Sequence, residues 1–142
     1  MYYLDTSAIV AALTEEASTK RVRAWLERQA ESAFAISDWT LAEVPSALSL
    51  KVRTGVLPIS ERNETLSFWR GSLLPTFARL NVTPTDFELA GSMAERHDLN
   101  LRASDALHIA VAYASGCTLV TLDKRMAEAA VACGVVVEAV SD

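Results

Sequence analysis

Short apolar runs of strand length recur along this chain, and helical segments separate them. The runs are Tyr2–Leu4, Ala33–Ile36, Leu80–Val82, Cys117–Thr121 and Val135–Val137. Several of them lack the alternation of apolar and polar residues that marks a strand with one face in solvent. Strands buried on both faces are typical of parallel sheets covered by helices. The pattern therefore predicts an α/β three-layer sandwich.

The intervals between these runs carry helix-start residues followed by apolar residues at helical spacing. We expect Thr6 to cap the first helix and Ser37 to cap the helix after the second run. Ser104 is expected to cap a late helix. Pro45 falls inside the helix that Ser37 begins, and we expect it to kink that helix because proline removes a backbone hydrogen bond.

Length and composition limit the class of protein. The chain has 142 residues, of which 51% are hydrophobic, so it can bury a substantial core. We expect one domain over residues 1–142. The formal net charge is −5, which by itself argues against a general nucleic-acid binder with a basic surface.

Neither the cysteines nor the histidines form a metal-binding spacing. Cys117 and Cys133 stand apart in apolar surroundings, which predicts reduced thiols, and His97 and His108 lie at no zinc-ligand distance from them. The N-terminus lacks the basic region of a signal peptide. The longest stretch without charged residues, Ala106–Leu122, is too short and too polar to span a membrane. We expect a soluble cytoplasmic protein.

Four carboxylates stand where strands end and helices begin. Asp5 follows the first run, Asp123 lies two residues after the fourth, Asp105 opens a helix, and Glu43 lies on the helix after the second run. Sites in parallel sheets form at the carboxyl ends of the strands. Carboxylates held together repel one another, and a hard divalent cation such as Mg²⁺ or Mn²⁺ relieves that repulsion. Simple helix capping explains the same positions equally well, so spacing alone leaves the metal site open.

Four motifs in order carry a family resemblance. They are Tyr3–Val10 (YLDTSAIV), Leu41–Leu48 (LAEVPSAL), Leu101–Ala110 (LRASDALHIA) and Leu119–Met126 (LVTLDKRM). On these motifs the chain resembles the PIN-domain ribonucleases, specifically the VapC-type toxins of toxin–antitoxin pairs. The resemblance extends from Met1 to Val137.

The resemblance implies a parallel sheet of four or five strands in the order 3-2-1-4-5. It also implies hydrolysis of RNA by a metal-activated water, a bound Mg²⁺ or Mn²⁺, a neutralising antitoxin and a homodimer. Asp5 and Asp105 would be direct metal ligands, and Glu43 and Asp123 would complete the catalytic pocket. Pro45, two residues after Glu43, departs from the family pattern and would redirect Glu43 if it kinks the helix.

Further residues receive supporting roles from the same comparison. Thr6 or Ser7, together with Thr121, would orient the carboxylates through hydrogen bonds. Arg102 and Lys124 flank two of the acidic motifs, so they are expected either to hold RNA phosphates or to be ordinary solvated charges.

Other polar residues have simpler interpretations. His108 lies three residues after Asp105, but its apolar neighbours favour a packed core histidine over a ligand. Lys20, Arg21 and Arg23 form a basic cluster that is typical of a solvated helix face.

Two other phosphate-handling classes do not fit. A response-regulator receiver domain needs adjacent acids after its first strand, and a haloacid-dehalogenase-type phosphatase needs a second Asp where Ser7 stands. A PIN-like module that binds RNA or a partner with weak or no nuclease activity stays open as the alternative. Without the four motif acids the chain has 14 acidic and 13 basic residues, so its acidity does not exclude RNA.

Overall fold

A computed structural model describes residues 1–29 and 33–140. Five strands form one parallel sheet in the order β3-β2-β1-β4-β5. Their bounds are β1 Tyr2–Leu4, β2 Phe34–Ser37, β3 Ala78–Leu80, β4 Thr118–Val120 and β5 Val137–Glu138. The sheet type and the strand order expected from the sequence are confirmed.

Seven α-helices occur in the described part of the chain. They are α1 Thr6–Leu13, α2 Thr19–Arg28, α3 Asp38–Arg53, α4 Ile59–Phe68, α5 Pro84–Ala94, α6 Ala103–Ser115 and α7 Lys124–Ala132. A π-helix, η1 Trp69–Leu73, and a 3-10 helix, η2 Leu74–Thr76, continue from α4, and a further 3-10 helix, η3 His97–Leu99, follows α5. None of the helices that the structure describes is both long and apolar enough to cross a membrane.

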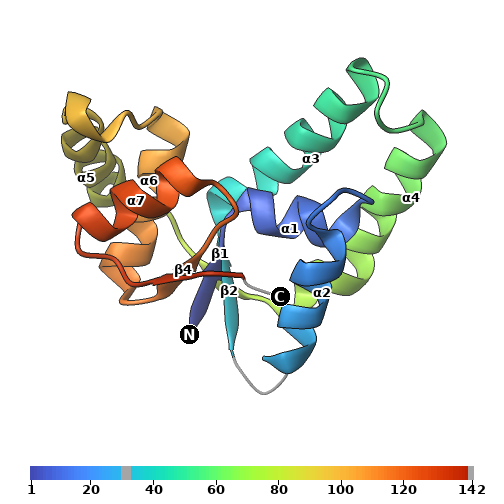
Figure 1. Cartoon of the computed structure of the whole chain (residues 1–142), viewed down its shortest axis with the longest axis horizontal. Helices are drawn as coiled ribbons and strands as arrows, with labels where there is room; N and C mark the ends of the chain where they lie inside the picture. The colour runs from blue at the N-terminus through green and yellow to red at the C-terminus, as the bar shows by residue number, and fades with distance from the viewer. Residues whose placement is uncertain (30–32, 141–142) are drawn as a thin grey trace.

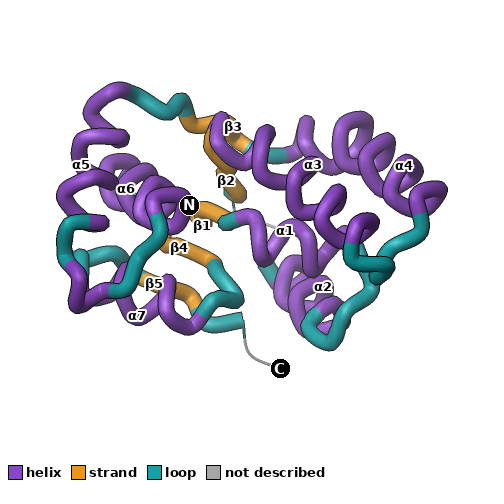
Figure 2. The backbone as a smooth tube through the Cα atoms, turned by 90° about the horizontal axis from the view of Figure 1, so that it is seen from above, coloured by secondary structure: helices purple, strands orange, loops and turns teal. Residues whose placement is uncertain are grey.

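The helices cover both faces of the sheet and make the predicted three layers. Helices α5, α6 and α7 lie on one side, and α1 to α4 lie on the other (Figure 1; Figure 2). Each face has its own cluster of buried side chains. Tyr3 belongs to the α5–α7 cluster, and the next residue, Leu4, belongs to the α1–α3 cluster. Successive strand residues are thus buried on opposite faces, which explains the missing polar alternation.

Two strands lie away from their expected positions. We expected the third strand at Leu80–Val82 and the last at Val135–Val137, whereas the structure has Ala78–Leu80 and Val137–Glu138. Both are outer strands of the sheet; β3 contains exposed residues such as Ala78, and the two residues of β5 are half-buried. The apolar runs therefore predict the wrong residues for these two strands, because pairing with the neighbouring strand sets where each of them lies.

Two helix starts also differ from the expectation. Asp5, not Thr6, is the N-cap of α1, and its side chain accepts a hydrogen bond from the Ala8 backbone N–H. Helix α6 begins at Ala103, and its N-cap is Arg102 rather than Ser104. Helix α3 runs from Asp38 to Arg53 as one helix with Pro45 inside it.

Candidate functional site

Three of the four predicted carboxylates stand in segments that follow strands, and the fourth, Asp105, lies at the start of the helix that precedes β4. Asp5 directly follows β1, and Asp123 caps α7 after β4. Glu43 is in the second turn of α3, which follows β2, and Asp105 is in the first turn of α6. Because β1, β2 and β4 are parallel neighbours, their following segments meet at one edge of the sheet.

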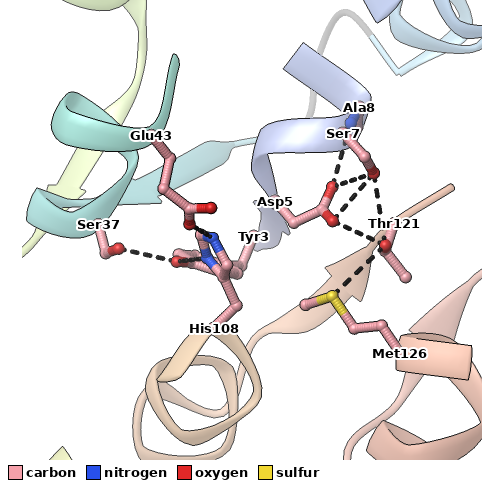
Figure 3. Close-up of polar contacts among 9 residues, drawn as sticks. All are labelled: Tyr3, Asp5, Ser7, Ala8, Ser37, Glu43, His108, Thr121 and Met126. Atoms are coloured by element: carbon pink, nitrogen blue, oxygen red, sulfur yellow. Dashed lines mark hydrogen bonds and ion pairs between the residues drawn. The ribbon is translucent and has the colours of Figure 1, made fainter. Parts of the chain in front are cut away.

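Asp5 is the most deeply buried of these acids, with 4% of its surface exposed. Its carboxylate accepts hydrogen bonds from Ser7 Oγ at 2.7 and 2.9 Å and from Thr121 Oγ1 at 2.7 Å (Figure 3). The Ala8 backbone N–H adds a third donor at 3.1 Å. Burial raises the pKa of Asp5 above its ordinary value, and His108 and these donors oppose that rise. The side chain is therefore held in one orientation from several directions.

Two hydroxyls tie the end of β1 to the turn after β4. Ser7 Oγ accepts a hydrogen bond from the Leu122 backbone N–H at 3.0 Å, and Thr121 Oγ1 accepts one from the Asp123 N–H at 3.1 Å. Ser7 and Thr121 thus make the contacts that the sequence assigned to them. Thr6 does not, because its hydroxyl has no hydrogen-bond partner in the described part of the chain.

Glu43 is fixed by a buried polar chain that crosses three elements. Its Oε1 lies 2.5 Å from His108 Nε2, and Nε2 must donate because a carboxylate only accepts (Figure 3). On the other side of the ring, Nδ1 lies 2.6 Å from the Tyr3 hydroxyl, whose single O–H donates to Ser37 Oγ at 2.8 Å. Helix α3 therefore presents Glu43 to the site despite the proline two residues later.

His108 combines both interpretations that the sequence allowed. It is 2% exposed, so the expectation of a core histidine is confirmed. Its contact with Glu43 spans 65 positions of the sequence, and no local pattern signals it. It contacts the candidate site through Glu43.

Asp105 and Asp123 complete the edge with carboxylate oxygens that remain available. Asp123 Oδ1 accepts from the backbone N–H groups of Arg125 and Met126, which leaves Oδ2 open. Asp105 is partly buried, and no donor among the described residues hydrogen-bonds its side chain. Burial raises the pKa of Asp105, and the negative charges of Asp123, Glu43 and Asp5 raise it further.

The donor set suits a hard cation but does not form a closed cage. In residues 1–29 and 33–140, no group of three or more His, Cys, Asp or Glu side chains is close enough to hold a metal by itself. Mg²⁺ keeps several waters and uses one or two carboxylates together with substrate phosphates. Asp105, which has no hydrogen bond to give up, therefore fits such a partial ligand set, as does the free Oδ2 of Asp123.

Two clefts flank the loop that carries Asp123. One, of about 490 Å³, is lined by residues that include Thr6, Ser7, Arg21 and Asp123. The other, of about 260 Å³, shares Arg21 and Asp123 and adds Lys124. Lys124 is exposed at this second cleft, and the exposed Arg102 directly precedes α6.

Comparison with known proteins agrees with this architecture. The profile of the PIN domain family matches residues 2–132. The chain belongs to the PIN domain family. Ribonuclease VapC35 of Mycobacterium tuberculosis is 28% identical to this PIN domain over 144 residues, which cover 98% of this chain and 96% of the relative.

Solved structures extend the likeness. The crystal structure of FitAcB from Neisseria gonorrhoeae superposes on the PIN domain with a TM-score of 0.77 at 26% identity, covering 99% of this chain and 98% of that one. VapC20 of Mycobacterium tuberculosis, described as a sarcin-ricin loop cleaving toxin, gives a TM-score of 0.67 at 20% identity and covers 91% and 95%. The resemblance of the sequence to VapC-type PIN proteins is thereby confirmed.

Proposed function

We propose that this chain is a single PIN domain over residues 1–142 that acts in the cytoplasm as an endoribonuclease toxin. It would depend on Mg²⁺ or Mn²⁺ and would be neutralised by a cognate antitoxin. The likeness to ribonuclease VapC35 along almost the whole of both chains supports the nuclease class.

The main support for the proposal is the concentration of negative charge around Asp105. Burial and the charges of three other carboxylates raise its pKa, and His108, which contacts Glu43, opposes that rise only in part, so the site concentrates negative charge. Such an arrangement is costly unless a cation or proton neutralises it. A protein that only binds RNA gains nothing from it, because the phosphates are also negative. Metal-dependent phosphodiester chemistry explains the arrangement.

In this proposal some residues of the site bind the cation, and others hold the binding carboxylates in position. Asp105 and Asp5 would hold the cation, while Glu43 and Asp123 would complete the pocket. Ser7 and Thr121 keep the Asp5 carboxylate in place, and His108 does the same for Glu43. A bound Mg²⁺ or Mn²⁺ supplies Lewis-acid polarisation of the phosphoryl oxygen and lowers the pKa of water in its coordination shell.

Cleavage of RNA by matched variants tests the proposal. Wild type should cut a panel of cellular RNAs with Mg²⁺ or Mn²⁺ and should stop in excess EDTA. Asp105→Asn should lose cleavage and remain folded, while Asp98→Asn, the same change at an exposed acid on η3, should keep it. Equal cleavage in EDTA would contradict the metal. Binding of RNA without any cleavage would favour the alternative, a PIN-like binding module.

We further propose an antitoxin partner and a homodimer. The solved structures of FitAB with a DNA fragment and of VapBC2 from Rickettsia felis with promoter DNA are of the same fold. Co-expression with the product of the adjacent reading frame should yield a complex in which RNA cleavage is lost.

The mass of the isolated chain by light scattering should be twice 15.4 kDa. A monomer at micromolar concentration would refute the dimer.

A further inference from the structure

Arg21 on α2 differs from the solvated helix face that the sequence predicted for the cluster of Lys20, Arg21 and Arg23. It is partly buried and lines both clefts that flank the Asp123 loop. Its Nε is buried without a hydrogen-bond partner, and no described residue forms an ion pair with its guanidinium. Two residues on, Arg23 shows the ordinary arrangement, with Glu15 at 2.9 Å and the Ala12 carbonyl at 2.9 Å.

Among the described residues, none of the acids that share these clefts with Arg21 forms an ion pair with it, and two of them have other partners. Glu16 pairs with Lys51 at 2.8 Å, and Glu138 accepts from the Trp25 indole at 3.3 Å. Asp123 accepts from the first turn of α7. Arg21 therefore lines both clefts, and its charge is not paired by any of these carboxylates.

An unpaired guanidinium at the edge of a protein interior is costly, and an anion would remove the cost. Phosphate suits it because the planar fork of arginine donates two parallel hydrogen bonds to phosphate oxygens. Thr6, whose buried hydroxyl has no partner among the described residues, also lines the larger of the two clefts. A negative site also needs a local cation to bring RNA against its carboxylates, since the chain has a net charge of −5.

We propose that Arg21 binds a backbone phosphate of the RNA beside the one that is cut, and so positions the strand across the carboxylates. This inference rests on the proposed nuclease function and deepens it. The strand would pass from the Arg21 clefts over the Asp123 loop, with Lys124 on its path. Arg21 is then a substrate-positioning residue.

The test compares Arg21→Gln with Lys20→Gln, which removes the same charge from an exposed neighbour on α2. RNA affinity is measured in the inactive Asp105→Asn background, so that cleavage does not interfere. Arg21→Gln should weaken binding about tenfold. It should also reduce the slope of log affinity against log salt by about 0.7, the value for one single-strand phosphate contact. In the active protein, KM should rise about tenfold while kcat changes less than twofold.

Each outcome has a separate meaning. Arg21→Lys should restore part of the salt slope, which a purely structural role would not do. If Arg21→Gln and Lys20→Gln have the same affinity and the same slope, the inference is wrong and the nuclease proposal stands. If wild type binds RNA through Arg21 but never cleaves it with Mg²⁺ or Mn²⁺, the nuclease proposal is wrong. Far-ultraviolet circular dichroism confirms that each variant is folded.

Discussion

Replacing Tyr3 by Phe removes one oxygen from the centre of the buried polar chain that holds Glu43. The Tyr3 hydroxyl contacts Ser37 Oγ and His108 Nδ1, and all three residues are at most 2% exposed. Burial raises the pKa of Tyr3 well above its ordinary value, so the hydroxyl stays protonated and able to donate. Water cannot readily replace it in this position.

The expected loss follows from the two groups left without a partner. Each buried polar group that loses its hydrogen bond costs about 1–3 kcal/mol, and Ser37 can turn its hydroxyl, which favours the lower part of that range. We expect Tyr3→Phe to lower the free energy of unfolding by about 2–4 kcal/mol in total. A chain of 142 residues loses about 3.4 °C of Tm per kcal/mol, so Tm should fall by about 7–14 °C.

Tyr2→Phe is the matched control on the same strand. The Tyr2 hydroxyl has no hydrogen bond among the described residues, and the ring contacts with Trp25 and Phe34 survive the change. Its effect should stay within about 0.5 kcal/mol. Urea unfolding at 25 °C in metal-free buffer, followed by circular dichroism, measures both variants. Equal midpoints for the two would refute the argument that the polar chain contributes to stability.

The same substitution also reports on the site. With Nδ1 unpartnered, His108 no longer holds Glu43 in one orientation, so cleavage by folded Tyr3→Phe should fall about tenfold or more. Cleavage is measured well below the Tm of the variant. Unchanged cleavage together with the expected loss of stability would confine the role of the polar chain to folding.

Three other predictions concern charge, metal and backbone. Because burial and neighbouring acids raise the pKa of Asp105, the folded state binds that proton more tightly than the unfolded state. The resulting stabilisation is full below about pH 4 and is lost as pH rises through the folded pKa, so metal-free wild type should lose stability relative to Asp105→Asn over that range. Parallel urea midpoints across pH would contradict this. Mn²⁺ at a hundred times its Kd should raise the free energy of unfolding of wild type by about 2.7 kcal/mol, measured by thermal melting, and Asp105→Asn should gain less. Equal gains would place the ion elsewhere. Gly116, which ends α6 at φ +64°, should cost about 1 kcal/mol when changed to Ala, whereas Gly71→Ala, with no positive φ and open space around it, should not destabilise. Urea midpoints of the two variants decide this.

The sequence predicts the sheet well at its centre and less well at its edges. The central strands β1 and β4 carry contiguous apolar residues because both faces are buried, and their positions were recognised from that pattern. Strand β3 contains the exposed Arg79, which an apolar pattern cannot find. Its position depends on pairing with Ala35 to Ser37, a long-range property.

In the candidate site, too, contacts within a short segment could be predicted from the sequence, whereas contacts between distant segments could not. Ser7 lies two residues from Asp5, so its hydrogen bond was foreseeable from the sequence. Thr6 is an equally good candidate by residue type, but its buried hydroxyl has no hydrogen-bond partner among the described residues. The Glu43 to His108 contact and the location of Arg21 depend on how separate helices pack across the sheet edge. The spacing of residues within one segment therefore cannot predict these two features.

The strand order has a consequence for how the chain is made. The central strand β1 is the first to be synthesised, yet one of its two neighbours, β4, starts at Thr118. The hydroxyl of Thr121, which hydrogen-bonds Asp5, comes late in the sequence, and so do Asp105 and Asp123. A chain growing on a ribosome from its N-terminus carries an incomplete carboxylate edge until Thr121 and Asp123 have been translated. The proposed nuclease activity would therefore require synthesis of the chain at least as far as Thr121 and Asp123.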